Sequence, residues 1–477
     1  MKENIIGREF ECDRLQKALE TKKSQLIIIY GRRRVGKTFL VNQFFNEQFA
    51  FKVTGVFNKP KEVQLQVFTK SLENYFNSQF DIPSNWIDAF NVLRNNLGKL
   101  PKNKKMVVFF DEMPWMDTQK SDFLAAFEWF WNDWGCIQDN LIFIVCGSAA
   151  SWLVKNIDHN KGGMFNRQNC KLYLEPFNLN QTKQFLKSKN IDWADYDIAM
   201  CYMIMGGIPY YLDLLTNDYS LNQNIDNLFF KKHGFLWDEF SHLYNTLFSN
   251  SETHIKIVEA LSEKRIGLSK KEIAEKTHLS QNGRLTEMLS NLVSSGFVRE
   301  YHFYGNNKKQ HLFQLSDYYT MFYFKFIKNQ KGIDENFWTN STRTSSINAW
   351  SGFTFEQLCK DHLKQIKQKL GISGVLTTES SWFVHGDDEH EGAQIDMLLD
   401  RRDHIINVCE MKFSNDEYEI DKKYDLTLKR KINRFREVTK TNKTLLLTMI
   451  TTYGVKKNMY SNIVQSQVTL KDLFREE

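Results

Sequence analysis

The sequence predicts an α/β protein whose N-terminal region is built on a parallel sheet. Short, unbroken apolar runs at 24–31, 105–112 and 140–152 have the length and the β-branched or aromatic content of buried strands. Segments with helical spacing lie between them, at 37–47 and 122–134. Strands without polar alternation are covered on both faces, and alternating strands and helices favour parallel pairing.

The composition is that of a soluble protein with several domains. The chain has 477 residues, so roughly three domains are expected at ~150 residues each. A net charge of +6 is compatible with nucleic acid as a partner but does not indicate it. The seven cysteines are scattered, which predicts reduced thiols and no zinc site. We expect a cytoplasmic protein, because no apolar run is long enough for a signal peptide core or a membrane span.

A phosphate-binding loop is predicted directly after the first strand. Gly31, Gly36, Lys37 and Thr38 fit the pattern G-x-x-x-x-G-K-[ST]. Glycine allows positive φ and leaves room for phosphate oxygens, while Lys37 supplies a cation and Thr38 a hydroxyl ligand for Mg²⁺. The nucleotide-binding residues are expected to be Gly31, Arg32, Arg33, Arg34, Val35, Gly36, Lys37, Thr38 and Phe39. The three arginine side chains are expected to face solvent, and a plain basic turn is the alternative for the whole loop.

Two acids and a serine follow the next two strands, at the sheet edge where α/β proteins bind ligands. Asp111 fits the acid on the metal side, and Glu112 fits a general base that polarises the attacking water. Ser148 is placed to orient that water. The alternatives are two acids that cap the next helix and an ordinary serine in a turn.

These segments resemble the Walker A, Walker B and sensor-1 elements of AAA+-type ATPases, and more narrowly the archaeal-type ATPases of bacteria and archaea. The segments IIGREFECDRL at 5–15, LYLEPF at 172–177 and MGGIPYYL at 205–212 are similar to that group as well. The resemblance implies binding and hydrolysis of ATP with Mg²⁺. It also implies that Pro209, in a Gly-x-Pro turn, contacts the adenine, although a plain turn is the alternative.

Arg167 is a candidate arginine finger, because a planar guanidinium can neutralise charge that develops on the γ-phosphate. The sequence leaves open whether Arg167 acts in its own chain, acts in a neighbouring subunit of an oligomer, or pairs with an acid on the surface.

Four regions are expected, with the P-loop core at 1–177 and a helical lid at 178–250. Two helices and a strand hairpin then predict a winged-helix domain at 251–330. Its recognition helix, at 281–294, carries a single arginine, Arg284. The cationic residues of the wing that could meet phosphates are Arg299, Lys308 and Lys309. A module that only mediates domain contacts is the alternative.

The last region, at 345–477, contains a helix with Glu356 and a predicted strand hairpin with Asp396 on one strand and Glu410 and Lys412 on the other. Two carboxylates and a lysine on adjacent strands can bind Mg²⁺ and align a water against phosphorus. This set resembles the PD-(D/E)XK nuclease core, with Ile395 in place of the proline. The resemblance implies an α/β restriction-endonuclease-like domain and metal-dependent cleavage by Glu356, Asp396, Glu410 and Lys412. A salt bridge between Glu410 and Lys412 is the alternative.

The strongest footprint for nucleic acid is a basic tract near the C-terminus, consisting of Lys422, Lys423, Lys429, Arg430, Lys431, Arg434 and Arg436. It predicts DNA as a partner, with a solvated helix face as the alternative. The leading hypothesis is therefore a Mg²⁺-dependent ATPase that acts on DNA. The runner-up is a nucleotide-gated switch whose C-terminal domains recruit a protein partner without cutting DNA.

Overall fold

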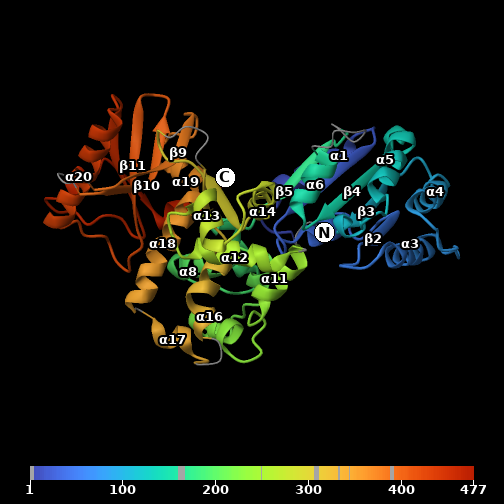
Figure 1. The fold of residues 1–477 in the computed structure, drawn as a ribbon, viewed down its shortest axis with the longest axis horizontal. Helices are drawn as coiled ribbons and strands as arrows, with labels where there is room; N and C mark the ends of the chain where they lie inside the picture. The colour runs from blue at the N-terminus through green and yellow to red at the C-terminus, as the bar shows by residue number, and fades with distance from the viewer. Residues whose placement is uncertain are drawn as a thin grey trace. The chain divides into compact units, whose positions relative to one another are not determined.

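A computed structural model describes residues 5–158, 167–248, 250–305, 311–330, 334–342, 344–386 and 391–476. The chain forms two compact units (Figure 1). The first consists of residues 1–176, 242–251 and 287–296, and the second consists of residues 177–241, 252–286 and 297–477.

The first unit contains a five-stranded sheet in the order β2-β3-β4-β1-β5. All of its strand pairs are parallel, which confirms the predicted α/β class. The strands are β1 (Gln25–Gly31), β2 (Phe51–Thr54), β3 (Met106–Asp111), β4 (Leu141–Gly147) and β5 (Cys170–Leu174). Because every strand runs the same way, the residues that follow β1, β3 and β4 share one edge of the sheet.

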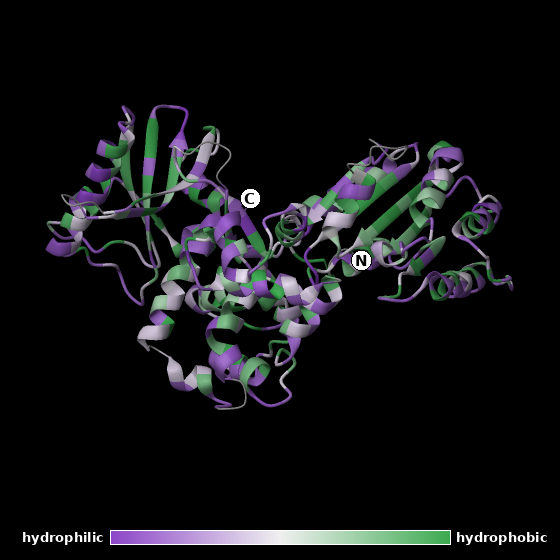
Figure 2. Cartoon of the chain, in the orientation of Figure 1, coloured by the Kyte–Doolittle hydropathy of each residue, from purple (hydrophilic) through white to green (hydrophobic). Residues whose placement is uncertain are grey.

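Helices cover this sheet through an aromatic core. They are α1 (Glu9–Glu20), α2 (Lys37–Phe44), α3 (Lys61–Phe76), α4 (Trp86–Leu97), α5 (Phe123–Asp133) and α6 (Ala150–Leu153). Phe90 of α4 stacks on Phe110 of β3 with ring centroids 5.8 Å apart, and Phe110 in turn lies 4.9 Å from Phe143 of β4. Figure 2 shows the hydrophobic colour concentrated on the strands, as expected for a sheet buried on both faces.

The segment after residue 178 is helical. Its helices are α7 (Leu179–Ser188), α8 (Asp195–Met205), α9 (Pro209–Asp213), α10 (Leu221–Ile225) and α11 (Glu239–Leu247). Asn178 begins α7 with a capping box, in which its side chain accepts from the backbone N–H of Gln181.

Three helices and a small antiparallel sheet occupy the segment predicted as a winged helix. The elements are α12 (Ser251–Ser262), β6 (Leu268–Ser269), α13 (Lys270–Thr277), α14 (Gly283–Ser294), β7 (Val298–Tyr301) and β8 (Leu312–Leu315), with the sheet order β6-β8-β7. The hairpin of β7 and β8 is confirmed, whereas the winged-helix class stays a prediction. Lys308 and Lys309 lie outside the described residues.

The C-terminal region has a second five-stranded sheet, in the order β13-β12-β11-β10-β9. Its strands are β9 (Thr377–Val384), β10 (Ala393–Arg401), β11 (Ile405–Lys412), β12 (Thr444–Thr451) and β13 (Ser466–Thr469). The predicted hairpin is present as the antiparallel pair β10 and β11, while β12 and β13 continue the sheet in parallel. The helices that precede or cross it are α15 (Tyr318–Phe322), α16 (Lys328–Gln330), α17 (Phe337–Ser341), α18 (Ser345–Asp361), α19 (Leu363–Lys369) and α20 (Lys422–Thr439).

Within the described part of the chain, no helix combines the length and the apolar character needed to cross a membrane.

Candidate functional site

The loop between β1 and α2 needs both of its glycines. Gly31 has φ +147°, and a Cβ there would lie 2.3 Å from the carbonyl oxygen of Leu174 in β5. Gly36 has φ +90° and immediately precedes α2. A side chain at either position would be strained, so the loop keeps its backbone close to the sheet edge and its N–H groups near the positive end of α2.

The side chains of Lys37 and Thr38 both form hydrogen bonds at this loop. The ammonium of Lys37 is buried and donates to the carbonyl oxygens of Gly31 at 3.0 Å and Arg32 at 2.9 Å. The hydroxyl of Thr38 donates to the carboxylate of Asp111, at 2.9 Å and 3.1 Å from its two oxygens. The strand order thus brings the predicted metal-side acid against the predicted hydroxyl ligand.

Glu112 and Ser148 are in direct contact. The Oε2 atom of Glu112 accepts from both the backbone N–H and the Oγ–H of Ser148, each at 2.9 Å. The backbone of Glu112 adopts the left-handed conformation, with φ +45° and ψ +45°, which is uncommon for a residue other than glycine. Ser148 therefore positions the carboxylate of the predicted base.

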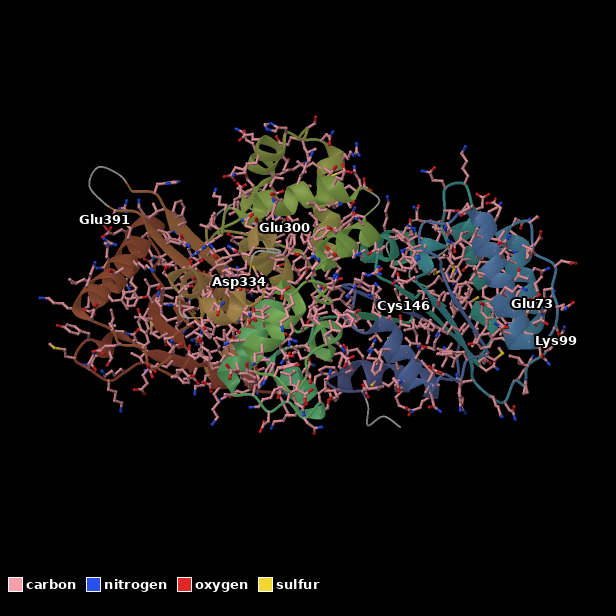
Figure 3. The ribbon with its side chains drawn as sticks, turned by 90° about the horizontal axis from the view of Figure 1, so that it is seen from below. Glu73, Lys99, Cys146, Glu300, Asp334 and Glu391 are labelled. Carbon is pink, nitrogen blue, oxygen red and sulfur yellow. The ribbon has the colours of Figure 1, made fainter. Side chains whose placement is uncertain are left out.

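Burial changes the pKa values around this loop. It raises the pKa of Asp111, helped by the neighbouring charge of Glu112, and it lowers the pKa of Lys37. Cys146 lies in the interior beside these groups (Figure 3), where burial raises the pKa of its thiol well above the ordinary value. Cys146 is thus a neutral packing residue, since the thiol and not the thiolate is the stable form there.

Arg8 is a residue of this site to which the sequence analysis gave no role. Its guanidinium donates to the carbonyl oxygen of Val35 in the loop at 3.2 Å and to that of Glu175 at 2.8 Å, and it lies 3.5 Å from Glu11. Only 6% of Arg8 is exposed. Arg8 therefore fixes the loop to the segment after β5, and its place in the motif IIGRE was the only signal in the sequence.

One expectation about the loop arginines is corrected. Arg32 does not face solvent, since only 2% of it is exposed. The side chain of Phe39 is 52% exposed, and its contact with a nucleotide stays a prediction.

Arg167 precedes β5 at the opposite edge of the sheet, because Cys170 is level with Ile27 and not with Gly31. The role of Arg167 as an arginine finger stays a prediction.

Pro209 begins α9 after the turn at Gly206 and Gly207. A Cβ on Gly207 would lie 2.1 Å from the carbonyl oxygen of Phe177, which explains the glycine by close packing. The turn that the sequence allowed is present, and contact of Pro209 with adenine stays a prediction.

In the C-terminal sheet, the carboxylate of Glu410 is held by three side chains. Oε1 accepts from the hydroxyl of Tyr424 at 2.5 Å and lies 3.0 Å from the ammonium of Lys412, while Oε2 accepts from Lys431 at 2.9 Å. Only 6% of Glu410 is exposed. Burial alone would raise the pKa of Glu410, but Lys412 and Lys431 together lower it. The ion pair that the sequence allowed as an alternative is therefore present, with a buried carboxylate and a half-buried lysine.

Glu356 and Asp396 lie near this carboxylate. Burial, followed by the charge of Asp396, raises the pKa of Glu356 to about 8, so it keeps its proton at neutral pH. The pairing of β9 with β10 shifts register between Ile395 and Leu398, on either side of Asp396. Such bulges re-aim a side chain, and they are common beside active sites.

The two acid sites differ in how well they suit Mg²⁺. Thr38 and Asp111 offer the oxygen ligands that Mg²⁺ shares with a nucleotide phosphate, so this site fits the ion. Asp396 and Glu410 also offer oxygens, but Glu410 is already occupied by Lys412, Lys431 and Tyr424. That arrangement does not fit a divalent ion, and over the described ranges no group of three or more His, Cys, Asp or Glu side chains is placed to hold one.

Several of the predicted phosphate contacts form ion pairs within the chain. Arg299 pairs with Asp361, and its contact with phosphate stays a prediction. In α20, Lys429 pairs with Asp425 at 2.7 Å and Arg430 pairs with Glu391, which lies at the periphery of the C-terminal region (Figure 3). The exposed cations of the basic tract that remain are Lys422, Lys423 and Arg436.

Comparison with known proteins agrees with the N-terminal geometry. Residues 5–215 match the family model of an ATPase domain predominantly from Archaea. An uncharacterized protein of Methanocaldococcus jannaschii, MJECL04, is 24% identical over 406 residues, which cover 83% of this chain and 84% of that protein. An uncharacterized ATP-binding protein of the same organism, MJ0423, is 42% identical over 44 residues, 9% of this chain and 75% of that protein.

Two solved structures are similar to parts of this chain. The Walker-type ATPase PABY2304 of Pyrococcus abyssi is 17% identical with a TM-score of 0.48, covering 68% of this chain and 97% of that chain. The ORC2 protein of Aeropyrum pernix in ADPNP and ADP complexes is 14% identical with a TM-score of 0.43, covering 69% and 96%.

The contact of Arg8 with the loop predicts a binding defect. Arg8→Ala removes the donor that holds the carbonyl of Val35, so the loop should lose its fixed shape and nucleotide affinity should fall about tenfold, as expected for a lost buried hydrogen bond from a charged group. Calorimetric titration with ATP measures the change. Arg14→Ala is the control, since Arg14 is exposed on α1, the helix that Arg8 precedes. Unchanged affinity in Arg8→Ala would show that the contact is only structural.

The occupied carboxylate of Glu410 predicts how the C-terminal region responds to metal. Lys431→Gln removes a positive charge from Oε2 but keeps a donor there, so the affinity for Mn²⁺ without nucleotide should rise by at least about tenfold. Lys431→Arg keeps the charge and should bind as weakly as the wild type. Calorimetry with Mn²⁺ tests this, with Lys429→Gln as the control on the same helix. Equal affinity in wild type and Lys431→Gln would contradict the prediction.

Proposed function

We propose that this protein binds ATP together with Mg²⁺, hydrolyses it and couples the hydrolysis to an action on DNA. The observation that carries the ATPase part is the contact of Thr38 with Asp111 beside a glycine-framed loop that encloses Lys37. The match of residues 5–215 to an ATPase domain family supports it.

Each polar residue at the carboxyl edge of the parallel sheet has a role in this proposal. Lys37 lies inside the loop, where its charge would meet the outer phosphates, and Thr38 and Asp111 would hold the ion. Bound Mg²⁺ would neutralise charge on the phosphoryl group that is transferred. Glu112 would take a proton from the attacking water, and Ser148 keeps the carboxylate of Glu112 in one orientation.

DNA is proposed as the partner because exposed cations remain on α20 after the internal ion pairs are formed. Lys422 and Lys423 lie in its first turn and Arg436 near its end. Contacts of this kind position a protein on the phosphate backbone without reading sequence. A metal-dependent nuclease, which the resemblance implies, would first require Lys431 to leave Glu410, so the proposal includes contact with DNA and not its cleavage.

A second candidate function is a nucleotide-gated switch that recruits a protein partner. The observation in its favour is that Arg299 and Lys431, two predicted phosphate contacts, are held in ion pairs with acids of the same chain. In that version, ATP shifts a population between two conformations and DNA is not bound.

The ATPase assignment predicts distinguishable defects in two variants. Lys37→Ala removes the cation from the loop and should lower ATP turnover by about a hundredfold or more. Glu112→Gln loses only the base, so ATP should remain bound while hydrolysis falls by a similar factor. Phosphate release and nucleotide retention on a filter measure the two effects.

Matched controls are available on the surface of the same unit. Lys99 is exposed and Glu73 is half-buried beside Lys70, and Lys99→Ala and Glu73→Gln should leave turnover unchanged (Figure 3). Normal turnover in Lys37→Ala would discard the role of the loop, and rapid hydrolysis in Glu112→Gln would discard the base.

DNA as the partner predicts an affinity that depends on salt concentration, which distinguishes it from a protein partner. If α20 contacts phosphates, affinity for duplex DNA should fall steeply between two salt concentrations, and the double variant Lys422→Ala, Lys423→Ala should lower the slope of log K against log salt by about 1.8. Fluorescence anisotropy measures both. The double variant Lys99→Ala, Lys102→Ala is the control, and absence of binding at low salt would favour the switch.

A further inference from the structure

A pocket of about 770 Å³ lies within the second unit and has no role in the proposed ATPase. It is bounded by the residues after β7, by α18 and by strands β9 and β10, and the side chains of Glu356 and Asp396 are part of its lining. Pockets of this size hold small ligands, whereas a nucleic acid duplex requires an open groove.

Three phenylalanines are part of the pocket wall, among side chains that are mostly charged or polar. Phe303 follows β7, Phe353 belongs to α18 and Phe383 belongs to β9. Phe383 is 38% exposed, although it is a large apolar side chain beside a packed sheet. The guanidinium of Arg265 lies 5.3 Å from the ring of Phe353. Exposed aromatic faces with a nearby arginine are the groups on which unpaired bases stack.

Polar groups stand beside these rings. Gln394 donates to Asp396 at 2.5 Å, and Glu356 lines the same space. Carboxylate and amide groups of this kind form hydrogen bonds with the edge of a base that is not paired. Gln394 and Asp396 keep donor and acceptor atoms beyond the bond between them, and these atoms suit a polar ligand better than a lipid or an apolar peptide.

The pocket is preformed, because the segment after β7 is fixed to the edge strand β9. The backbone N–H of Tyr304 donates to the carbonyl oxygen of Ser381 at 2.8 Å, and the hydroxyl of Ser381 donates to the carbonyl oxygen of Asp396 at 2.7 Å. The ring of Tyr304 packs 5.1 Å from that of Phe435. A wall held in this way does not need to be ordered by its ligand.

We propose that this pocket binds an unpaired base of single-stranded DNA, with Phe303 and Phe383 as its stacking surfaces. This inference rests on the part of the proposed function in which the protein acts on DNA, and it names the form of DNA. It needs neither ATP hydrolysis nor strand cleavage.

The test compares DNA forms with the full chain in EDTA and without nucleotide, so that hydrolysis and cutting play no part. Anisotropy is measured with a labelled single strand, a blunt duplex of the same sequence and a strand that carries abasic sites. The intact single strand should bind at least about fivefold tighter than the other two. Phe383→Ala and Phe303→Ala should each weaken single-strand binding about 5- to 100-fold, whereas Phe383→Tyr keeps a stacking ring and should bind normally.

Phe235→Ala is the matched control, since Phe235 is 78% exposed in the same unit and does not line the pocket. If the two alanine variants bind single strands like the wild type, or if abasic strands bind equally well, the pocket assignment is overturned while action on DNA stands. If no form of DNA binds at low salt, both the inference and the DNA part of the proposed function fail.

Discussion

The parallel register of β1 is the constraint on which the N-terminal site depends. β1 lies between β4 and β5, and β3 lies on the far side of β4. This order aligns the carboxyl ends of three strands, so that residues separated by over seventy positions meet. The strand order alone brings Thr38 into contact with Asp111 and Glu112 into contact with Ser148. The same register requires Gly31 to have no side chain, because β5 ends against it.

The sequence predicted those features that depend on residues close together in the chain. Buried strands identify themselves by unbroken apolar runs, so β1, β3 and β4 were predictable, as was the hairpin of β10 and β11. β2, with four residues, and β13, also with four, carry too little pattern to be found. The residues of the loop were predicted by their spacing. The burial of Arg32 and the contacts of Arg8 were not predicted, because they depend on β5 and the residues that follow it. No local pattern reports such distant partners.

The C-terminal acids show the same limit more clearly. Asp396, Glu410 and Lys412 were found by their spacing in a hairpin. Lys431 was assigned to a basic surface because its neighbours in sequence are basic, yet the helical repeat turns it toward Glu410. Removing one partner of a buried ion pair leaves an uncompensated charge that costs roughly 3–5 kcal/mol, so these contacts hold α20 on the sheet as well as neutralising the acid. The sequence motif alone does not show whether a carboxylate binds a metal ion or is already paired with cations of the protein, as Glu410 is.

The position of the segment after β7 changes how the predicted wing can work. β9 is the edge strand of its sheet, and exposed edges recruit further strands unless they are covered. Tyr304 covers part of this edge through its backbone and its ring. Arg299, on β7, is anchored to Asp361 of α18. The described part of β7 is therefore held at two points, at Arg299 and just beyond its end at Tyr304. This anchoring stabilises one wall of the pocket that Phe303, Glu356 and Asp396 line together, which is the surface that the proposed base contact uses.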